Sequence, residues 1–273
     1  MLAIVVAAAM LAPAGAAHGA NVYEVTAAGA RPSGKGTLAR PLPVAIRFGY
    51  AVTDENPVNR ASVVRQYRIA SEGLVTFPGI FPSCTFSQAA RARVSRACRE
   101  ARVGGGRVFN VAGPSADPTA KAVCNLGLTL YNVTRRARRP ARSARRSRGA
   151  LAIRLDGDPP APADPGSRRP GCSLSIHTAI YAPFRTVRLG GLPASELRFR
   201  VPDNLAHPVT GLDNSVREAV SSVRRKLRRA RLGGKSRRLG FYNSVGCKRR
   251  RTTRVRFVDE QGRPFTARKS TRC

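Results

Sequence analysis

The sequence predicts an all-β protein, an antiparallel β-sandwich of immunoglobulin-like general architecture with at most one or two short helices. Three observations support this prediction. Hydrophobic and polar residues alternate with a period of two in many short segments. Gly, Pro, Asn and Asp separate these segments, and no long amphipathic helices alternate with them. The chain is also 42% hydrophobic, which excludes an intrinsically disordered protein.

The clearest strand lies at 122–132, where Cys124 and three leucines share one face while Asn125 and Thr129 lie on the other. The same alternation predicts strands at 44–48, 151–155, 172–180 and 197–201, and more weakly at 23–26, 63–69 and 107–111. The C-terminal residues predict a meander of three strands, 239–247, 252–258 and 265–273, with a turn at Gln261-Gly262.

Three segments are less regular. Residues 87–102 predict a short helix or an ordered loop closed by Cys84. Residues 215–231 fit either a helix or a strand at 216–223 followed by a basic turn through Gly233-Gly234, and the strand-like surroundings favour the strand. We interpret the triplet 104–106, three consecutive glycines, as a turn.

The first 20 residues have the pattern of a secretory signal peptide, with an apolar run followed by small residues. That run is too short to cross a bilayer as a helix, so the expected product is a secreted or cell-envelope-associated protein after signal peptide cleavage. We divide the remainder into a main β-sandwich region, 21–202, with a long Arg-rich loop at 135–148, and a C-terminal β-meander, 203–273. The meander either packs on the first region or forms a small separate domain.

Six cysteines in an exported chain predict three disulfides. Six cysteines allow 15 connectivities, so the sequence does not determine the pairing. Nearness in sequence and strand register favour Cys84 with Cys98, Cys124 with Cys172, and Cys247 with Cys273.

The formal net charge is +34, with 49 Lys and Arg against 15 Asp and Glu. The candidate polyanion-binding residues lie in two acid-free runs: Arg135, Arg136, Arg138, Arg139, Arg142, Arg145, Arg146, Arg148, Arg224, Arg225, Lys226, Arg228 and Arg229. Such clusters favour binding of acidic wall polymers, extracellular DNA or anionic lipid headgroups. The competing interpretation is drift toward arginine codons in a GC-rich genome. Aromatic residues are missing from both runs, which argues against sequence-specific nucleic-acid recognition.

No motif predicts catalysis, a metal site or a cofactor. His177 is expected to be a solvated or cross-strand residue, and His207 precedes Pro208 in a turn. The cysteines form no Cys-x-x-Cys pair, which excludes the usual zinc spacing. Asp156 and Asp158, with Asp164 nearby, suggest a weak calcium loop or, preferably, a solvated acidic turn.

Several features occur in a recognisable order: residues 81–84 (FPSC), Cys98 before 103–106 (VGGG), the Cys124 strand, 201–202 (VP), 211–213 (GLD), 240–247 (GFYNSVGC) and the terminal Cys273. In this order the chain resembles a group of uncharacterised secreted proteins of high-GC actinobacteria. The resemblance covers most of the mature chain and implies an all-β secreted fold with a strand at 216–223. It implies no activity.

The leading functional hypothesis is therefore a non-enzymatic, disulfide-stapled protein of the cell envelope or extracellular space. The alternative is a dedicated polyanion binder that uses the Arg clusters. A third hypothesis is a secreted hydrolase whose site is assembled from residues distant in sequence.

Overall fold

The computed structural model describes residues 20–91, 95–134, 149–164 and 166–273, and most of them lie in antiparallel strands. The strands of the first half are β1 (Asn21–Arg31), β2 (Leu42–Asp54), β3 (Val64–Ser71), β4 (Leu74–Thr76), β5 (Cys84–Thr85), β6 (Arg102–Pro114), β7 (Ala122–Thr134) and β8 (Ala150–Gly157). Those of the second half are β9 (Gly171–Cys172), β10 (Ile176–Leu189), β11 (Leu192–Arg200), β12 (Leu212–Val223), β13 (Leu227–Leu232), β14 (Lys235–Gly240), β15 (Tyr242–Ser244), β16 (Arg250–Asp259) and β17 (Pro264–Arg272).

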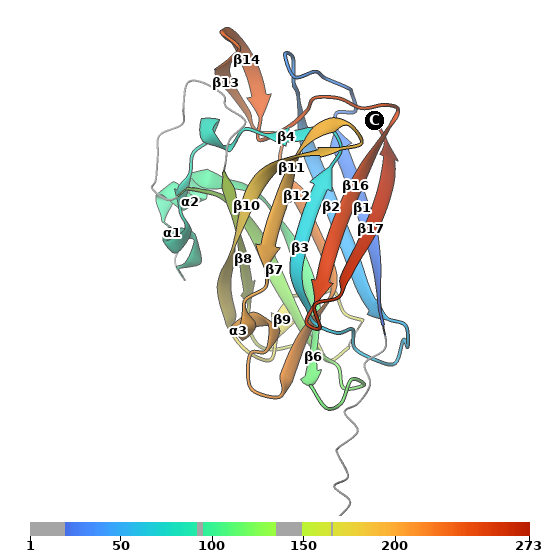
Figure 1. Ribbon diagram of the computed structural model, residues 1–273. Helices are drawn as coiled ribbons and strands as arrows, with labels where there is room; N and C mark the ends of the chain where they lie inside the picture. Colours follow the sequence, from blue (N-terminus) through green and yellow to red (C-terminus); the bar gives the residue numbers. More distant parts are fainter. Residues whose placement is uncertain (1–19, 92–94, 135–148, 165) are drawn as a thin grey trace, which may run out of the picture.

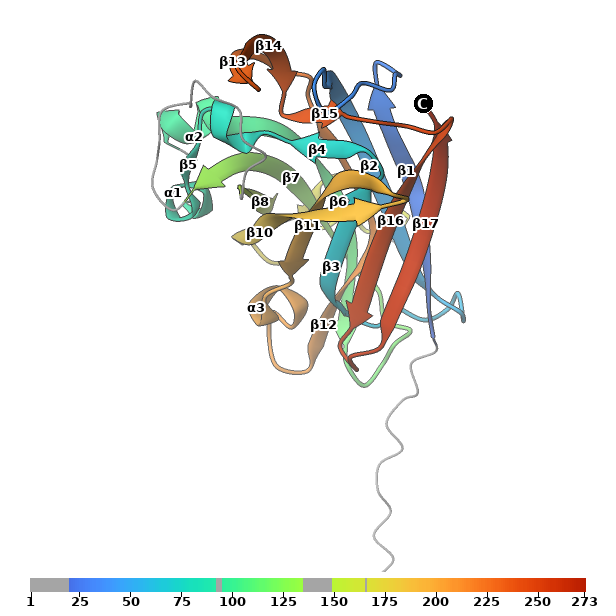
Figure 2. The same cartoon turned by 45° about the horizontal axis from the view of Figure 1, so that its top comes forward.

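Hydrogen bonds join fifteen strands along the path β17-β16-β3-β11-β10-β8-β7-β6-β12-β2-β15-β4, with β1 beside β2 and the short β5 and β9 beside β7. The path folds over into two facing layers (Figures 1 and 2). One layer contains β8, β7, β6, β12, β2 and β1, and the other contains β11, β3, β16 and β17. This arrangement confirms the predicted all-β, sandwich-like class.

Strand β10 connects the two layers. Its first half, Ile176 to Pro183, pairs with β8, and its second half, Phe184 to Leu189, pairs with β11. The change of partner occurs at Pro183, which has no N–H to donate to a ladder. A proline is therefore well placed where one ladder ends and the next begins.

The core fills the space between the layers. Tyr23 of β1 stacks on Phe257 of β16 and Phe265 of β17, with ring centroids 4.5 and 4.8 Å apart. Tyr50 of β2 packs against Tyr67 of β3 at 5.3 Å. These aromatic pairs hold the layers together, and burial raises the pKa of the Tyr23 hydroxyl to about 12.

The segment at 87–102, predicted as a short helix or an ordered loop, contains two short helices, α1 (Phe86–Ala90) and α2 (Arg96–Ala101). Thr85 caps α1 by accepting a hydrogen bond from the Gln88 amide, and the Gln88 side chain accepts one from the Thr85 amide. A 3-10 turn (Pro78–Ile80) precedes them, and a further helix, α3 (Asp203–Ala206), was not predicted because four residues give no periodic pattern.

Several strand predictions were wrong in detail. The strand at 172–180 breaks after Cys172 because β9 pairs with β7 while β10 pairs with β8, and Leu174 between them is exposed. The strand at 239–247 is divided between β14 and β15, and β15 pairs with β2 and β4 instead of β16. The Gly104–Gly106 triplet is not a turn: it lies inside β6, where a Cβ on Gly106 would come within 1.9 Å of the Val220 carbonyl oxygen.

Strand β12 contains the residues 216–223 that were ambiguous, and it is a strand, as favoured. It pairs with β6 on one side and β2 on the other, while β16 pairs with β3. Residues from 203–273 thus share sheets with strands from 21–202. The hairpin of β16 and β17 turns at Gln261-Gly262, as the alternation predicted.

The structure contains the three disulfides that sequence nearness favoured: Cys84–Cys98, Cys124–Cys172 and Cys247–Cys273. The first links β5 to α2. The second links β7 to β9, where Cys124 and Cys172 are also direct cross-strand partners. The third ties the residue after β17 to the loop between β15 and β16.

Candidate functional site

The strands run back and forth, so their connections gather at two ends of the sandwich (Figure 1). We call the end with residues 32–41, 72–91, 95–101 and 224–249 the basic end. The opposite end, with residues 54–63, 114–121, 156–164, 166–175, 200–213 and 259–263, is the polar end. Only two acids, Glu72 and Glu100, lie at the basic end, whereas ten of the chain's 15 lie at the polar end: Asp54, Glu55, Asp117, Asp156, Asp158, Asp164, Asp203, Asp213, Asp259 and Glu260.

The hairpin of β13 and β14 projects from the basic end as a separate two-stranded sheet (Figures 1 and 2). Its strands meet at Gly233-Gly234, and both glycines have positive φ angles of 56° and 78°. A tight two-residue hairpin turn needs this conformation, which glycine adopts without steric cost. The predicted basic turn is therefore the tip of a β-hairpin, and the Gly-Gly pair between basic segments was the sequence signal for it.

One face of this hairpin presents Arg229 and Arg231 of β13 and Arg238 of β14, all exposed. Arg229 and Arg238 are direct cross-strand partners, which places their Cβ atoms about 5 Å apart. Like charges in this position repel each other. Within the described residues, no salt bridge joins the hairpin's basic side chains to an acid, so their charge is directed at solvent.

Lys226 lies at the base of the hairpin among like charges. Its Nζ donates a hydrogen bond to the Arg102 carbonyl oxygen at 2.7 Å. Partial burial, reinforced by the charges of Arg224, Arg102 and Arg228, holds the pKa of the Lys226 ammonium below its ordinary value. A cavity of about 240 Å³ opens beside it, and its charged lining residues are Arg102, Lys226, Arg228 and the acid Glu100. Three cations against one acid give this part of the surface a net positive charge.

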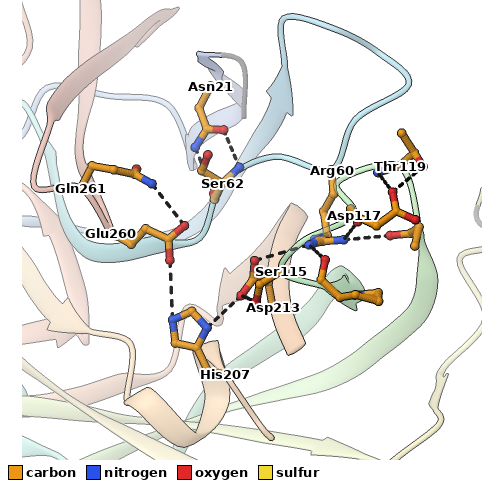
Figure 3. Close-up of polar contacts among 12 residues, drawn as sticks. Asn21, Arg60, Ser62, Ser115, Asp117, Thr119, His207, Asp213, Glu260 and Gln261 are labelled. Atoms are coloured by element: carbon orange, nitrogen blue, oxygen red, sulfur yellow. Dashed lines mark hydrogen bonds and ion pairs between the residues drawn. The ribbon is translucent and has the colours of Figure 1, made fainter. Parts of the chain in front are cut away.

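At the polar end, the buried Arg60 guanidinium joins two loops (Figure 3). Its Nη1 donates to the Ala120 carbonyl oxygen at 2.8 Å, and its Nη2 donates to that of Pro114 at 3.0 Å and lies 3.4 Å from Asp213 Oδ2. Gly113 gives the guanidinium room, because a Cβ there would lie 2.4 Å from Nη1. A charge that is paired and hydrogen-bonded in this way is tolerated inside a protein.

Asp213 connects this arginine to a histidine. Its Oδ1 accepts a hydrogen bond from Ser115 Oγ at 2.7 Å and lies 3.0 Å from His207 Nδ1, while His207 Nε2 lies 3.6 Å from Glu260 (Figure 3). Serine, histidine and aspartate are the residue types of a hydrolase triad, but their arrangement in space is different here. A catalytic imidazole lies between the acid and the serine and accepts the serine's proton, whereas here the carboxylate lies between them.

His177 of β10 lies directly across from Asp156 of β8, which confirms the predicted cross-strand position. Its ring nitrogens lie 3.1 Å from Asp156 and 3.0 Å from Asp158, and the hydrogen bond to Asp156 raises the pKa of the exposed imidazole. Burial raises the pKa of Asp156, but hydrogen bonds from Arg154 and His177 outweigh it and leave that pKa lowered. Within the described residues, no group of three or more His, Cys, Asp or Glu side chains is arranged to hold a metal.

The predicted basic residues therefore have different outcomes. Residues 135–148 lie outside the described residues. The structure brings Arg224, Arg225, Lys226, Arg228 and Arg229 together at the base and on the first strand of the hairpin. Sequence reasoning missed the opposing strand, which adds Lys235, Arg237 and Arg238, because we expected a turn there. It also missed the Arg60 and Asp213 pair, whose members are 153 residues apart.

No protein-family model, no curated protein and no solved structure matches the chain. None of the helices in the described part of the chain is long and apolar enough to cross a lipid bilayer. Three disulfides indicate an oxidising compartment.

Proposed function

We propose that the protein is an exported, non-enzymatic, disulfide-stapled protein of the cell envelope or extracellular space that binds polyanions at its basic end. The observation that supports this proposal best is the β13–β14 hairpin, whose arginines point to solvent without an acidic partner among the described residues. Guanidinium groups grip phosphate and carboxylate in forked hydrogen bonds and release condensed counterions.

The distribution of charge favours binding over compositional drift. Compositional drift would add arginine to all tolerant surfaces equally and would not concentrate the acidic residues at one end. Here ten of the 15 acids lie at the polar end and only two at the basic end. Arg229 and Arg238 even face each other across the hairpin, an arrangement that a bridging anion would relieve.

The shape of the hairpin suits an extended polymer. Arg229 and Arg231 are two residues apart on one strand, so their backbone positions are about 7 Å apart, and Arg238 adds a third charge beside them. A row of closely spaced charges fits repeating phosphate groups, as in teichoic-acid-like wall polymers or DNA. It offers no base-reading groups, since the hairpin contains no aromatic residue.

The test is a salt series of binding to a 20-base-pair DNA duplex and to purified teichoic acid. The mature protein is compared with R229S/R231S/R238S and with R169S/R256S/R268S, a control that removes three exposed arginines outside the basic end. For DNA, the hairpin variant should lower the slope of log K against log salt by up to about 2.7, since each phosphate contact contributes about 0.9. Equal slopes for the two variants would refute the proposal.

A further inference from the structure

A further cavity lies between the two layers of the sandwich. It has a volume of about 130 Å³, and its lining is mostly apolar and comes from strands of both layers. On one side the lining runs from Ser195 of β11 to Val201 just after that strand, which is about 20 Å of extended chain. A small volume spread over this length makes the cavity long and narrow.

The side chains around this cavity show that the space between the layers is not completely filled. Folded interiors are normally packed as densely as organic crystals. Here several inward-facing apolar side chains pack against the core and line the cavity but are only partly buried: Phe48, Leu128, Leu197, Phe199 and Val216. An apolar cavity offers water too few hydrogen-bond partners, so it favours an apolar ligand.

The volume of the cavity sets the size of that ligand. A group of the size of a water molecule needs about 10 to 15 Å³ of such a space, so about ten groups fit. A methylene group is about as large as a water molecule. A single unbranched alkyl chain of about six to ten carbons therefore matches both the volume and the narrow shape.

Arg251 adds a charge to this apolar lining near the basic end. It is one of the alternate buried residues of β16, on the same inward face as Phe257, and is 3% exposed. Its Nε donates to the Glu72 carbonyl oxygen at 2.9 Å, and its Nη2 donates to Ser244 Oγ at 2.6 Å. Among the described residues, no carboxylate lies within ion-pair distance of its guanidinium group.

A buried arginine without an acidic partner requires an explanation, since buried charges are normally paired. The Nη1 atom of Arg251 has no hydrogen-bond partner in the described part of the chain, and it is not sealed from solvent. Burial lowers the pKa of the guanidinium, and the more distant charge of Glu72 offsets this only in part. A carboxylate at Nη1 would supply the missing partner through a charge-assisted hydrogen bond.

We propose that the cavity between the layers binds a medium-chain carboxylic acid, with its alkyl chain between the layers and its carboxylate at Arg251. The net positive charge of the basic end attracts such an anion toward Arg251. This site goes beyond the proposed polyanion function and does not depend on it, because none of the described residues of the β13–β14 hairpin lines the cavity.

Calorimetric titration of the mature protein, freed of bound lipid, with hexanoate, octanoate and decanoate at neutral pH tests the proposal. Affinity should rise about three- to fourfold with each added methylene group, the usual gain when one such group is buried. Octan-1-ol is the neutral counterpart of octanoate. It should bind about tenfold more weakly, because it lacks the charge-assisted hydrogen bond to Arg251.

Arg251→Met should weaken octanoate binding about tenfold and leave octan-1-ol binding unchanged. The matched control is Arg256→Met, because Arg256 lies on the exposed face of the same strand and does not line the cavity. It should leave the binding of both ligands unchanged. Leu128→Phe, which fills part of the cavity and keeps Arg251, should weaken the binding of both ligands.

Absence of binding of all three acids up to about 10 mM, or affinity that does not depend on chain length, would overturn the proposal. Equal loss of octanoate and octan-1-ol binding in folded Arg251→Met would overturn the role of Arg251. If that variant does not fold, the chain-length series and Leu128→Phe decide the outcome. The hairpin variant R229S/R231S/R238S should bind octanoate as the wild type does, which separates this proposal from the preceding one.

Discussion

The two ends of the sandwich differ in whether their arginine side chains are buried and paired or exposed to solvent. At the polar end, Arg60 is buried, and its terminal nitrogens contact loop carbonyl oxygens and Asp213. At the basic end, Arg229 and Arg238 are exposed and face each other. Arg60 therefore holds loops together at one end, whereas Arg229 and Arg238 at the other have no acidic partner among the described residues. The difference separates arginines that contribute to folding from arginines that are available to a ligand.

The disulfides follow the same division. Cys84–Cys98 and Cys247–Cys273 lie at the basic end, and Cys124–Cys172 lies at the polar end. Concentrated like charge destabilises a compact structure through self-repulsion. Covalent bonds are not weakened by that repulsion, so they suit the end that has few ion pairs to hold it.

The largest effect is expected from Asp213→Ala at the polar end. The substitution leaves the Arg60 charge buried without its acid, which typically costs about 3 to 5 kcal/mol. In a protein of this size that corresponds to a fall in melting temperature of roughly 10 °C, measured by circular dichroism. Arg229→Gln, the control at the basic end, should change stability by less than about 0.5 kcal/mol. Similar losses from both variants would remove the distinction between the ends.

Removal of the Cys247–Cys273 disulfide by double substitution to alanine should cost about 3 kcal/mol, given the 26-residue separation. Denaturant unfolding of the variant and the wild type measures it. Removal of Cys124–Cys172 at the polar end should cost more, about 4 kcal/mol, because that bond closes a longer segment with a separation of 48 residues. A smaller cost for Cys124–Cys172 than for Cys247–Cys273 would contradict the account.

Lys226 gives the basic end a pH dependence. Because its folded pKa is lowered, the folded state disfavours the charged ammonium, and this penalty is present below the folded pKa and disappears as pH rises toward 10.5. The stability of Lys226→Met relative to wild type should therefore fall by a few tenths of a kcal/mol between pH 8 and 10.5, since Lys226 is largely exposed. Thermal melts across that range test the sign, and a relative stability that rises would be inconsistent with a lowered pKa of Lys226.

His177, near the polar end, should give the smallest effect. Its contribution to stability should fall as pH rises, whereas that of Lys226 should become more favourable. The pKa of His177 is raised by the hydrogen bond to Asp156, so its contribution is complete below pH 6.5 and is lost as pH rises through the folded pKa. His177→Asn should lose a few tenths of a kcal/mol at pH 5.5 and nothing at pH 8.5, because the pair is exposed. A loss that persists at pH 8.5 would show that the ion pair is not its source.

The sequence predicted the elements whose pattern is local. The alternation around Cys124 identified β7, and the apolar positions in 216–223 identified β12. In both strands the pattern within the segment itself shows which residues face the core. Prediction failed where a strand changes partner. Residues 172–180 read as one strand, but β9 and β10 pair with different neighbours, and no local pattern encodes that choice.

The candidate sites divide in the same way. Runs of basic residues are visible in the sequence, so Arg228 and Arg229 of β13 were predicted. Arg231, and the hairpin that places Arg238 opposite Arg229, were not. The pair of Arg60 and Asp213 at the polar end has no sequence signal, because its two members are 153 residues apart. Such a pair is recognisable only after the chain has folded.

The most direct test of the central claim is amide hydrogen exchange of the mature protein with and without a saturating 20-base-pair DNA duplex or teichoic acid. The account predicts slower exchange in peptides covering 224–240, where the basic hairpin lies, and unchanged exchange in peptides covering 54–63 and 114–121 at the polar end. Slowing at the polar end, or none at 224–240 under saturating ligand, would contradict the claim that the unpaired arginines of the basic end form the binding surface.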